Sequence, residues 1–212
     1  MRETKDYLAL DPGHAFGVNY EENASNYDCD FNYVNQYDWP NEDMSSYKCL
    51  IINCHVDQEF LYKEKDRIRR FLDDKKIVIF SGNLYRDWLP GGSRFIPKKV
   101  TSHFDYQVSI VKPHPIFAGV ESDDLTYSRG VAGFFARGHH PLPEGAEVLL
   151  TLPGDVPILY VDRKSTKGTI LVHAGNDIFG SLRNPKISHA PGQLKQWIQD
   201  EYTRLQKDGA QR

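Results

Sequence analysis

Two short apolar runs that flank one charged segment constrain the fold of this chain more than any other feature. The runs are CLIINC at 49–54 and IVIF at 77–80. Apolar runs of this length are typical of strands that are buried on both faces of a sheet. We therefore expect adjacent parallel strands near 50–53 and 77–80.

The charged segment between the runs, DQEFLYKEKDRIRRFLDDKK, has the pattern of an amphipathic helix near 58–74. Asp57 is placed to cap the first helical turn. The apolar stripe that would face the sheet consists of Phe60, Leu61, Ile68, Phe71 and Leu72. A strand, a helix and a strand in this order predict a right-handed crossover between parallel strands.

The rest of the chain adds strand patterns of two kinds. DYLALDPG and FNYVNQYD precede the first unit, and YQVSIV, AEVLLTL, PILYVDR and GTILVHAG follow it. The turn-rich KSTKG between the last two patterns indicates a hairpin, and GQLKQWIQDEYTRLQK predicts a final amphipathic helix. We expect one α/β domain, with a mostly parallel sheet that a late antiparallel hairpin extends.

Size and charge narrow the classes of function. A chain of 212 residues is long enough for one well-buried domain, 1–212, and short for two. The formal net charge of -3 gives no general attraction to nucleic acid or to an anionic membrane, so we expect neither as a partner. No run of 18 apolar residues occurs, and MRETKDYLAL lacks the apolar core of a signal peptide. We expect a cytoplasmic protein. The sequence leaves open whether the protein forms a homo-oligomer.

The cysteines give no sign of a metal centre. Cys29, Cys49 and Cys54 form no CxxC pair, and their number is odd. We expect reduced thiols, no structural metal and no cofactor.

Charge is distributed unevenly near the start of the chain. Between Lys5 and Lys48 there is no lysine or arginine, while nine acidic residues occur from Asp6 to Asp43. The loop-rich part of this acidic segment, 15–47, is interpreted as a solvated face of the domain. An acidic docking surface, or a lid over a site, is the alternative.

Polar residues follow four of the predicted strands. In an open parallel sheet, ligands bind outside the carboxyl ends of the strands. We therefore expect one rim to carry a ligand site built from Asp11, His14, Cys54, His55, Gly82, Asn83, Gly175 and Asn176. The two glycines would let backbone amides approach the ligand, which favours an oxyanion, and the start of a helix after Ser81 would help.

Ser81 ends a predicted strand and invites comparison with a nucleophile elbow. His173 is placed to act as its base and Asp177 to orient the histidine, the order of a hydrolase triad. However, Ile79 stands where the G-x-S-x-G elbow has glycine. A hydroxyl that closes a turn after the strand is therefore the favoured interpretation, and the hydrolase is the alternative.

Three further histidines receive structural interpretations. His55 directly follows Cys54, so the two side chains would point to opposite faces of a strand and form no catalytic dyad. His139 and His140 follow the aromatic GFFARG, interpreted as a strand, and we expect them on an exposed loop.

The order of several phrases resembles one superfamily. DQEFLYKEKDRIRRFLDDKKIVIFSG is similar to the helix-and-strand unit of the class I glutamine amidotransferase-like superfamily. HPIFAGV, PILYVDRKSTKGTILVHAGND and LKQWI look more like its ThuA-like and beta-galactosidase middle-domain branches. The resemblance covers roughly 48–200 and implies a flavodoxin-like sheet with helices on both faces.

The resemblance also implies what has changed at the site. Glutaminases of the superfamily use a cysteine where this chain has Ser81, and a histidine followed two residues later by glutamate. If His173 takes the place of that histidine, Gly175 takes the place of the acid. A second register instead aligns AGND with the glycine-histidine-aspartate strand exit of ThuA-like proteins, and both registers stay open.

Three functions follow from these observations. The first is a degenerate amidotransferase-like domain, without glutaminase activity, that binds a small polar or anionic ligand such as a sugar or nucleotide derivative. The second is a hydrolase that uses Ser81 and His173. The third is an interaction module that presents the acidic segment to a basic partner. Whether the protein is an enzyme stays open.

Overall fold

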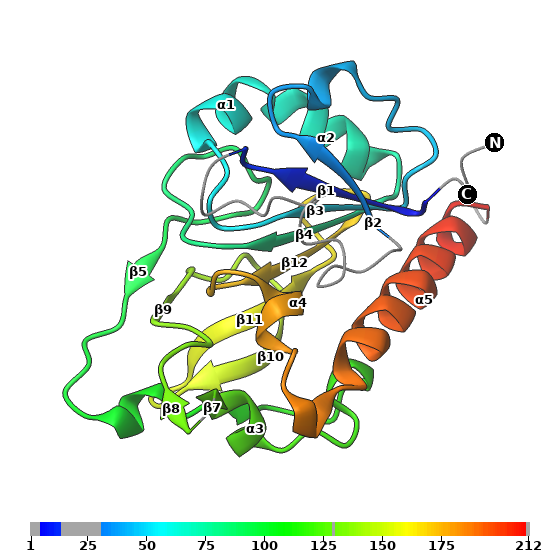
Figure 1. Ribbon diagram of the computed structural model, residues 1–212. Coiled ribbons are helices and arrows are strands. Elements are labelled where there is room, and N and C mark those ends of the chain that lie inside the picture. The colour runs from blue at the N-terminus through cyan, green and yellow to red at the C-terminus, as the bar shows by residue number, and fades with distance from the viewer. Residues whose placement is uncertain (1–4, 14–30, 129, 211–212) are drawn as a thin grey trace.

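The computed structural model describes residues 5–13, 31–128 and 130–210 and is built around one large sheet (Figure 1). In the described part of the chain this sheet has eight strands in the order β2-β1-β3-β4-β12-β11-β10-β6. In that order the strands are β2 (Phe31–Asn35), β1 (Tyr7–Asp11), β3 (Cys49–Ile52), β4 (Ile77–Ser81), β12 (Thr169–His173), β11 (Val156–Asp162), β10 (Glu147–Leu152) and β6 (Ser109–Ile110).

The sheet is parallel over its first five strands and antiparallel over the rest. The predicted parallel pair is confirmed, because Cys49 of β3 lies opposite Ile77 of β4 and Ile52 lies opposite Phe80. The predicted hairpin is also confirmed, since β11 and β12 pair in antiparallel register. The expected mixed α/β architecture is therefore what the chain forms.

One face of the sheet is covered by α1 (Gln58–Lys63) and α2 (Lys65–Asp73). Asp57 caps α1 as predicted, because its carboxylate accepts the amides of Glu59 and Phe60. The single helix expected near 58–74 is broken at Glu64, whose backbone leaves helical geometry at φ -94° and ψ 8°. The buried side of both helices still packs on alternate residues of β3 and β4.

The opposite face is covered by α5 (Ala190–Ala210), together with the short turn η4 (Pro115–Phe117). Leu194, Trp197 and Ile198 of α5 pack in the same cluster as Ile51 and Ile79 of the sheet. Helices therefore lie on both faces, as expected (Figure 1).

The remaining elements are short. Besides η4, the described residues form these short elements: β5 (Ile96–Pro97) with β9 (Gly138–His139), β7 (Tyr127–Ser128) with β8 (Val131–Ala132), α3 (Ser122–Thr126), α4 (Ile178–Ser181), η2 (Trp39–Asn41), η3 (His103–Tyr106) and η5 (Pro185–Ile187). GFFARG is not the strand that its aromatic residues indicated, because residues 133–137 form bends and irregular backbone and only Gly138 belongs to a strand, β9. Within the described ranges, no helix is both long and apolar enough to cross a membrane.

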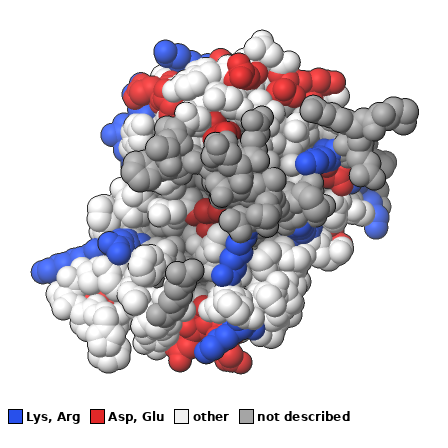
Figure 2. All heavy atoms as spheres, in the orientation of Figure 1, with Lys and Arg blue, Asp and Glu red and all other residues white. Residues whose placement is uncertain are grey.

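Figure 2 shows how charge is spread over one side of the molecule. Acidic side chains gather along the upper edge, over the layer formed by α1, α2 and the η2 turn. The projection at the lower left is mostly uncharged. Part of the acidic segment 15–47 lies outside the described residues; its described part contains β2 and a buried Trp39.

Candidate functional site

The exits of three parallel strands meet at one rim of the sheet. The amide of Cys54, after β3, donates to the carbonyl of Asn176, after β12, at 3.2 Å. The amide of Gly82, after β4, donates to the carbonyl of His173 at 3.0 Å. Three of the four exits expected to converge are therefore linked through their backbones.

The exit of β1 is joined to the rim by a buried glutamine. The side-chain amide of Gln36 donates to the Pro12 carbonyl at 2.8 Å, and its oxygen accepts the amide of Asp57 at 2.6 Å. Gln36 is only 2% exposed. Its position in a polar, loop-rich stretch gave no sign of this role.

A second buried glutamine, Gln58, fixes the loop after β4. Its nitrogen donates to the Asn83 carbonyl at 2.9 Å, and its oxygen accepts the Tyr85 amide and the Trp88 indole at 3.0 and 3.1 Å. The loop 82–95 is therefore held without a helix of its own. Its sequence position directly after the Asp57 cap was the only available signal for this glutamine.

Ser81 is the last residue of β4 and is fully buried. Its hydroxyl oxygen accepts the backbone amide of Ile178, at the first turn of α4, over 3.0 Å. The expected helix after Ser81 is wrong, because residues 82–95 form only turns and bends. The loop is fixed by the contacts of Gln58, so the strand-turn-helix geometry of a nucleophile elbow is not formed.

His173 lies opposite Ser81 in the parallel pairing of β12 with β4. Its Nε2 is 3.1 Å from the carbonyl oxygen of Phe135, so Nε2 carries the proton and donates. Its Nδ1 is buried and makes no hydrogen bond within the described residues, to Ser81 or to any other group. Burial lowers the pKa of His173 to about 3, which keeps the ring neutral.

Asp177 caps α4, and its carboxylate accepts the amide of Phe179 at 3.0 Å. Burial raises the pKa of Asp177, an effect that the amides of Gly180 and Phe179 and the charge of Arg183 oppose. No hydrogen bond joins Asp177 to His173 in the described structure, where His173 Nδ1 is without a partner. The Ser81, His173 and Asp177 side chains are thus brought to one region without the contacts of a triad.

The other residues predicted for the rim differ in their burial and in their contacts. Cys54 is half-buried, and its pKa is raised to about 11 by burial and by the nearby charge of Asp177. His55 is exposed, and the carboxylate of Asp11 accepts the amide of Gly13 at 2.9 Å. His14 lies outside the described residues. The remaining predicted residues, Gly82, Asn83, Gly175 and Asn176, follow β4 and β12.

Gly175 is required by close packing at the exit of β12. A Cβ atom there would lie 2.0 Å from the Phe135 carbonyl oxygen and 2.5 Å from Cε1 of His173. Gly82 has a φ of +151°, and its Cβ would meet the Cα of Cys54 at 3.0 Å. Both glycines therefore let the backbones of neighbouring exits approach each other.

The exposed loop expected for His139 and His140 is wrong for both residues, because His139 is half-buried in β9 and His140 is buried. His140 is only 1% exposed and lies between the rings of Phe80 and Phe95. Its Nε2 accepts the amide of Leu84 at 3.2 Å, and burial lowers its pKa to about 4. His140 therefore helps to hold the same loop that Gln58 fixes.

Two adjoining clefts of about 470 and 420 Å³ open beside the exits of β4 and β12. They share Phe134, Phe135 and Asn176, and we call the two together the rim cleft. One part is lined by Asp124, Asp177 and Arg183, and the other by Asn83, Gly175 and Arg137. Asp11, Cys54 and His55 are not among its described lining residues.

The rim cleft combines aromatic surface with polar groups of both charges. Phe134 is 62% exposed, and Tyr127, which also lines the cleft, is 37% exposed. Such a lining suits a small ligand with a flat or apolar face and several hydroxyl, amide or charged groups. Across residues 5–13, 31–128 and 130–210, no three histidine, cysteine or acidic residues are grouped so as to hold a metal ion.

Comparisons with known proteins support the fold and do not identify a function. No protein-family model and no curated protein sequence matches this chain. A glutamine amidotransferase from Thermotoga maritima is 12% identical, with a TM-score of 0.53, over 98% of this chain and 92% of that chain. A cytoplasmic protein from Salmonella typhimurium LT2 is 10% identical, with a TM-score of 0.51, over 92% of this chain and 98% of that chain.

One similar structure is a larger enzyme. An exo-beta-1,4-mannosidase from Opitutaceae bacterium strain TAV5 is 12% identical with a TM-score of 0.47, and the match covers 93% of this chain and 35% of that chain. This chain therefore spans about a third of the mannosidase. The likeness to the Thermotoga maritima and Salmonella typhimurium structures confirms the expected glutamine amidotransferase-like fold.

Proposed function

We propose that this chain, which has the glutamine amidotransferase-like fold, is a degenerate member of that architecture that binds a small polar ligand in the rim cleft. The ligand class is a sugar or nucleotide derivative. The observation that carries the proposal is the lining of the cleft, where exposed Phe134 and Tyr127 stand beside Asn83, Asn176 and charged side chains. An aromatic face and convergent polar groups together favour a ring-shaped ligand with many hydrogen-bonding groups.

The proposed lack of glutaminase activity rests on Ser81. The glutamyl thioester route needs a cysteine thiolate, and a serine hydroxyl is hardly ionised at neutral pH. Burial of Ser81 and its bond to the Ile178 amide keep its oxygen away from solvent and in use as an acceptor. The same contacts disfavour the hydrolase alternative.

The charge of the cleft allows, but does not require, an anionic ligand. Arg137 and Arg183 line it from two sides, while Asp124 and Asp177 line one part. We propose that a polar ligand with at most one or two negative charges fits this balance best. A cytoplasmic location would suit such a ligand.

A thermal-shift screen tests the proposal. Purified protein is heated with sugars, sugar phosphates, nucleotides and amino acids, and compounds that raise the melting temperature are titrated by calorimetry. Binding should weaken in Asn176→Ala and Asn83→Ala and should be unchanged in Asn41→Ala, an exposed asparagine of the η2 turn. A compound that binds all three variants with equal affinity would place the site elsewhere.

A further inference from the structure

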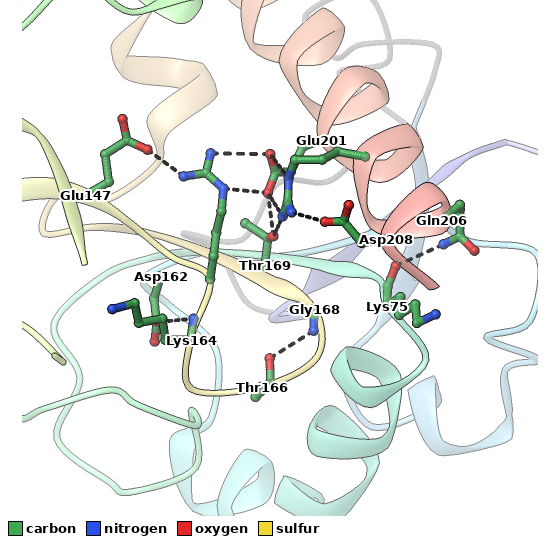
Figure 3. Close-up of polar contacts among 12 residues, drawn as sticks. Lys75, Glu147, Asp162, Lys164, Thr166, Gly168, Thr169, Glu201, Gln206 and Asp208 are labelled. Carbon is green, nitrogen blue, oxygen red and sulfur yellow. Dashed lines mark hydrogen bonds and ion pairs between the residues drawn. The ribbon is translucent and has the colours of Figure 1, made fainter. Parts of the chain in front are cut away.

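A second cleft, of about 450 Å³, lies at the opposite end of the parallel strands from the rim cleft. It is formed where the chain leaves α2, at the hairpin turn between β11 and β12, and at the last turns of α5 (Figure 3). Its polar lining is Lys75, Arg163, Thr166, Lys167, Arg204 and Asp208, and we call it the basic cleft. A cleft of this volume is within the range of small-molecule sites, about 300–1,000 Å³.

Two arginines of the basic cleft are held in place by one buried acid. Glu201 is 5% exposed and accepts from Arg163 Nε at 2.7 Å and from Arg204 Nη2 at 2.8 Å. Burial alone would raise the pKa of Glu201, but these bonds and the Thr169 hydroxyl outweigh it and lower the pKa to about 2. The guanidinium groups are therefore fixed before any ligand arrives.

Two further acids pair with these arginines, so the arginines offer directed donors and no surplus charge. Arg163 also contacts Glu147 at 2.5 Å, and Arg204 contacts Asp208 at 2.7 Å (Figure 3). Among the described lining residues Asp208 is the one acid, and it is paired with Arg204. An arginine has five N–H donors, so Arg163 keeps donors beyond the three that Glu147 and Glu201 accept.

Two lysines supply charge that is free for a ligand. In the described part of the chain, neither Lys75 nor Lys167 lies within ion-pair distance of a carboxylate. Lys167 is exposed and Lys75 is half-buried. The hydroxyl oxygen of Thr166 accepts the amide of Gly168 at 3.2 Å, which leaves its proton able to donate into the cleft.

The backbone at Lys75 points to a role for its side chain. Lys75 follows the C-cap of α2 and has a φ of +58°, the left-handed region where glycine is favoured. Its carbonyl accepts the side-chain amide of Gln206 from α5 at 3.2 Å (Figure 3). A contact between its ammonium group and a ligand would explain why a lysine occupies a position that suits glycine.

We propose that the basic cleft binds a small phosphate-bearing ligand, with Lys75 and Lys167 neutralising the phosphate and Thr166 and Arg163 donating hydrogen bonds. Lysine binds phosphate as a point charge and arginine adds directed donors. The competing explanation is that the lysines only offset the negative carboxyl-terminal ends of α2 and α5. That explanation predicts a change in stability on their removal and no anion site.

Calorimetric titration with inorganic pyrophosphate, at ionic strength held constant with chloride, separates the two. The test variant is the double substitution Lys75→Gly and Lys167→Ser. Glycine relieves the left-handed backbone at position 75, so the fold should be kept, and a melting curve checks this. The control is Lys164→Ser, which removes one positive charge from an exposed lysine of the same turn, outside the basic cleft.

We expect wild-type protein and the control to bind pyrophosphate with affinities within about twofold of each other. The affinity of the double variant for pyrophosphate should fall at least about tenfold, because two charge-assisted contacts are removed. No binding to the wild type, undiminished binding in the double variant, or an equal loss in the control would each overturn the proposal. Because these variants leave the rim cleft intact, this result is independent of the function proposed there.

Discussion

The hydroxyl oxygen of Ser81 accepts the backbone amide of Ile178 over 3.0 Å, although 97 residues separate them in the chain. The bond joins the end of β4 to the first turn of α4. It holds in place the loop that carries Asn176 and Asp177, two residues of the rim cleft. Ser81 is in this sense a positioning residue of the cleft.

Removal of this acceptor should destabilise the protein. Ser81→Ala leaves the Ile178 amide buried without its acceptor, which costs about 1–3 kcal/mol in free energy of unfolding. Urea denaturation measures the change. The exposed serine control, Ser188→Ala, should stay within about 0.5 kcal/mol of wild type. A Ser81→Ala protein as stable as wild type would mean that the amide finds another acceptor.

Neither Ser81 nor Cys54 should react quickly in the native protein. A fluorophosphonate should leave Ser81 unmodified, because its oxygen is buried and no hydrogen bond reaches it from His173. Iodoacetamide should label Cys54 far more slowly than in urea-unfolded protein, since a pKa of about 11 leaves little thiolate at pH 7. Mass spectrometry follows both reactions. Serine labelling that disappears in His173→Ala would instead establish the hydrolase.

Buried neutral histidines should make the protein sensitive to mild acid. The pKa of His140 is lowered in the fold from 6.5 to about 4, so its stabilising effect is complete above pH 6.5 and is lost as the pH falls towards 4. At pH 5 the loss is about 2 kcal/mol, at ~1.4 kcal/mol per pH unit. His140→Gln keeps an acceptor for the Leu84 amide and does not titrate.

Urea denaturation at pH 7 and pH 5 tests this pH dependence. Wild-type protein should lose about 2 kcal/mol more than His140→Gln between the two values. Equal losses in the two proteins would show that His140 is not held neutral by burial.

The glycine at the exit of β12 should tolerate no side chain. Gly175→Ala would place a methyl group 2.0 Å from the Phe135 carbonyl oxygen, so the β12 exit must shift, at a cost of about 1–3 kcal/mol. Gly192→Ala is the matched control, because its Cβ meets nothing within 4 Å and it lies within α5. It should stabilise the protein by about 0.5–1 kcal/mol. Thermal melting that ranks the two variants in the reverse order would contradict this packing.

The fold was largely predictable because its signals are local. The apolar runs at 49–54 and 77–80 and the capped helix after Asp57 depend on neighbouring residues, and the structure forms them. The break at Glu64 was not predictable, because the amphipathic stripe continues across it. The bends in GFFARG were missed because aromatic content alone favours a strand.

The site was predictable only in outline. The rule that polar residues at strand exits converge located Asn83 and Asn176, which both line the rim cleft. The burial of Gln36 and His140 arises from contacts with residues 21 to 56 positions away, and no sequence pattern encodes such contacts. Phe134 and Tyr127 were missed as cleft residues for the same reason.

Calorimetric titration of the strongest thermal-shift hit into Phe134→Ala and Phe104→Ala tests the proposed ligand cleft most directly. The two phenylalanines are 62% and 64% exposed, but only Phe134 lines the described cleft. We predict that Phe134→Ala loses at least about tenfold in affinity, because stacking on an aromatic ring contributes ~1–3 kcal/mol for a planar ligand. Phe104→Ala should bind like wild type. Equal affinity in all three proteins, or a screen in which no compound binds, would contradict a ligand site at the rim.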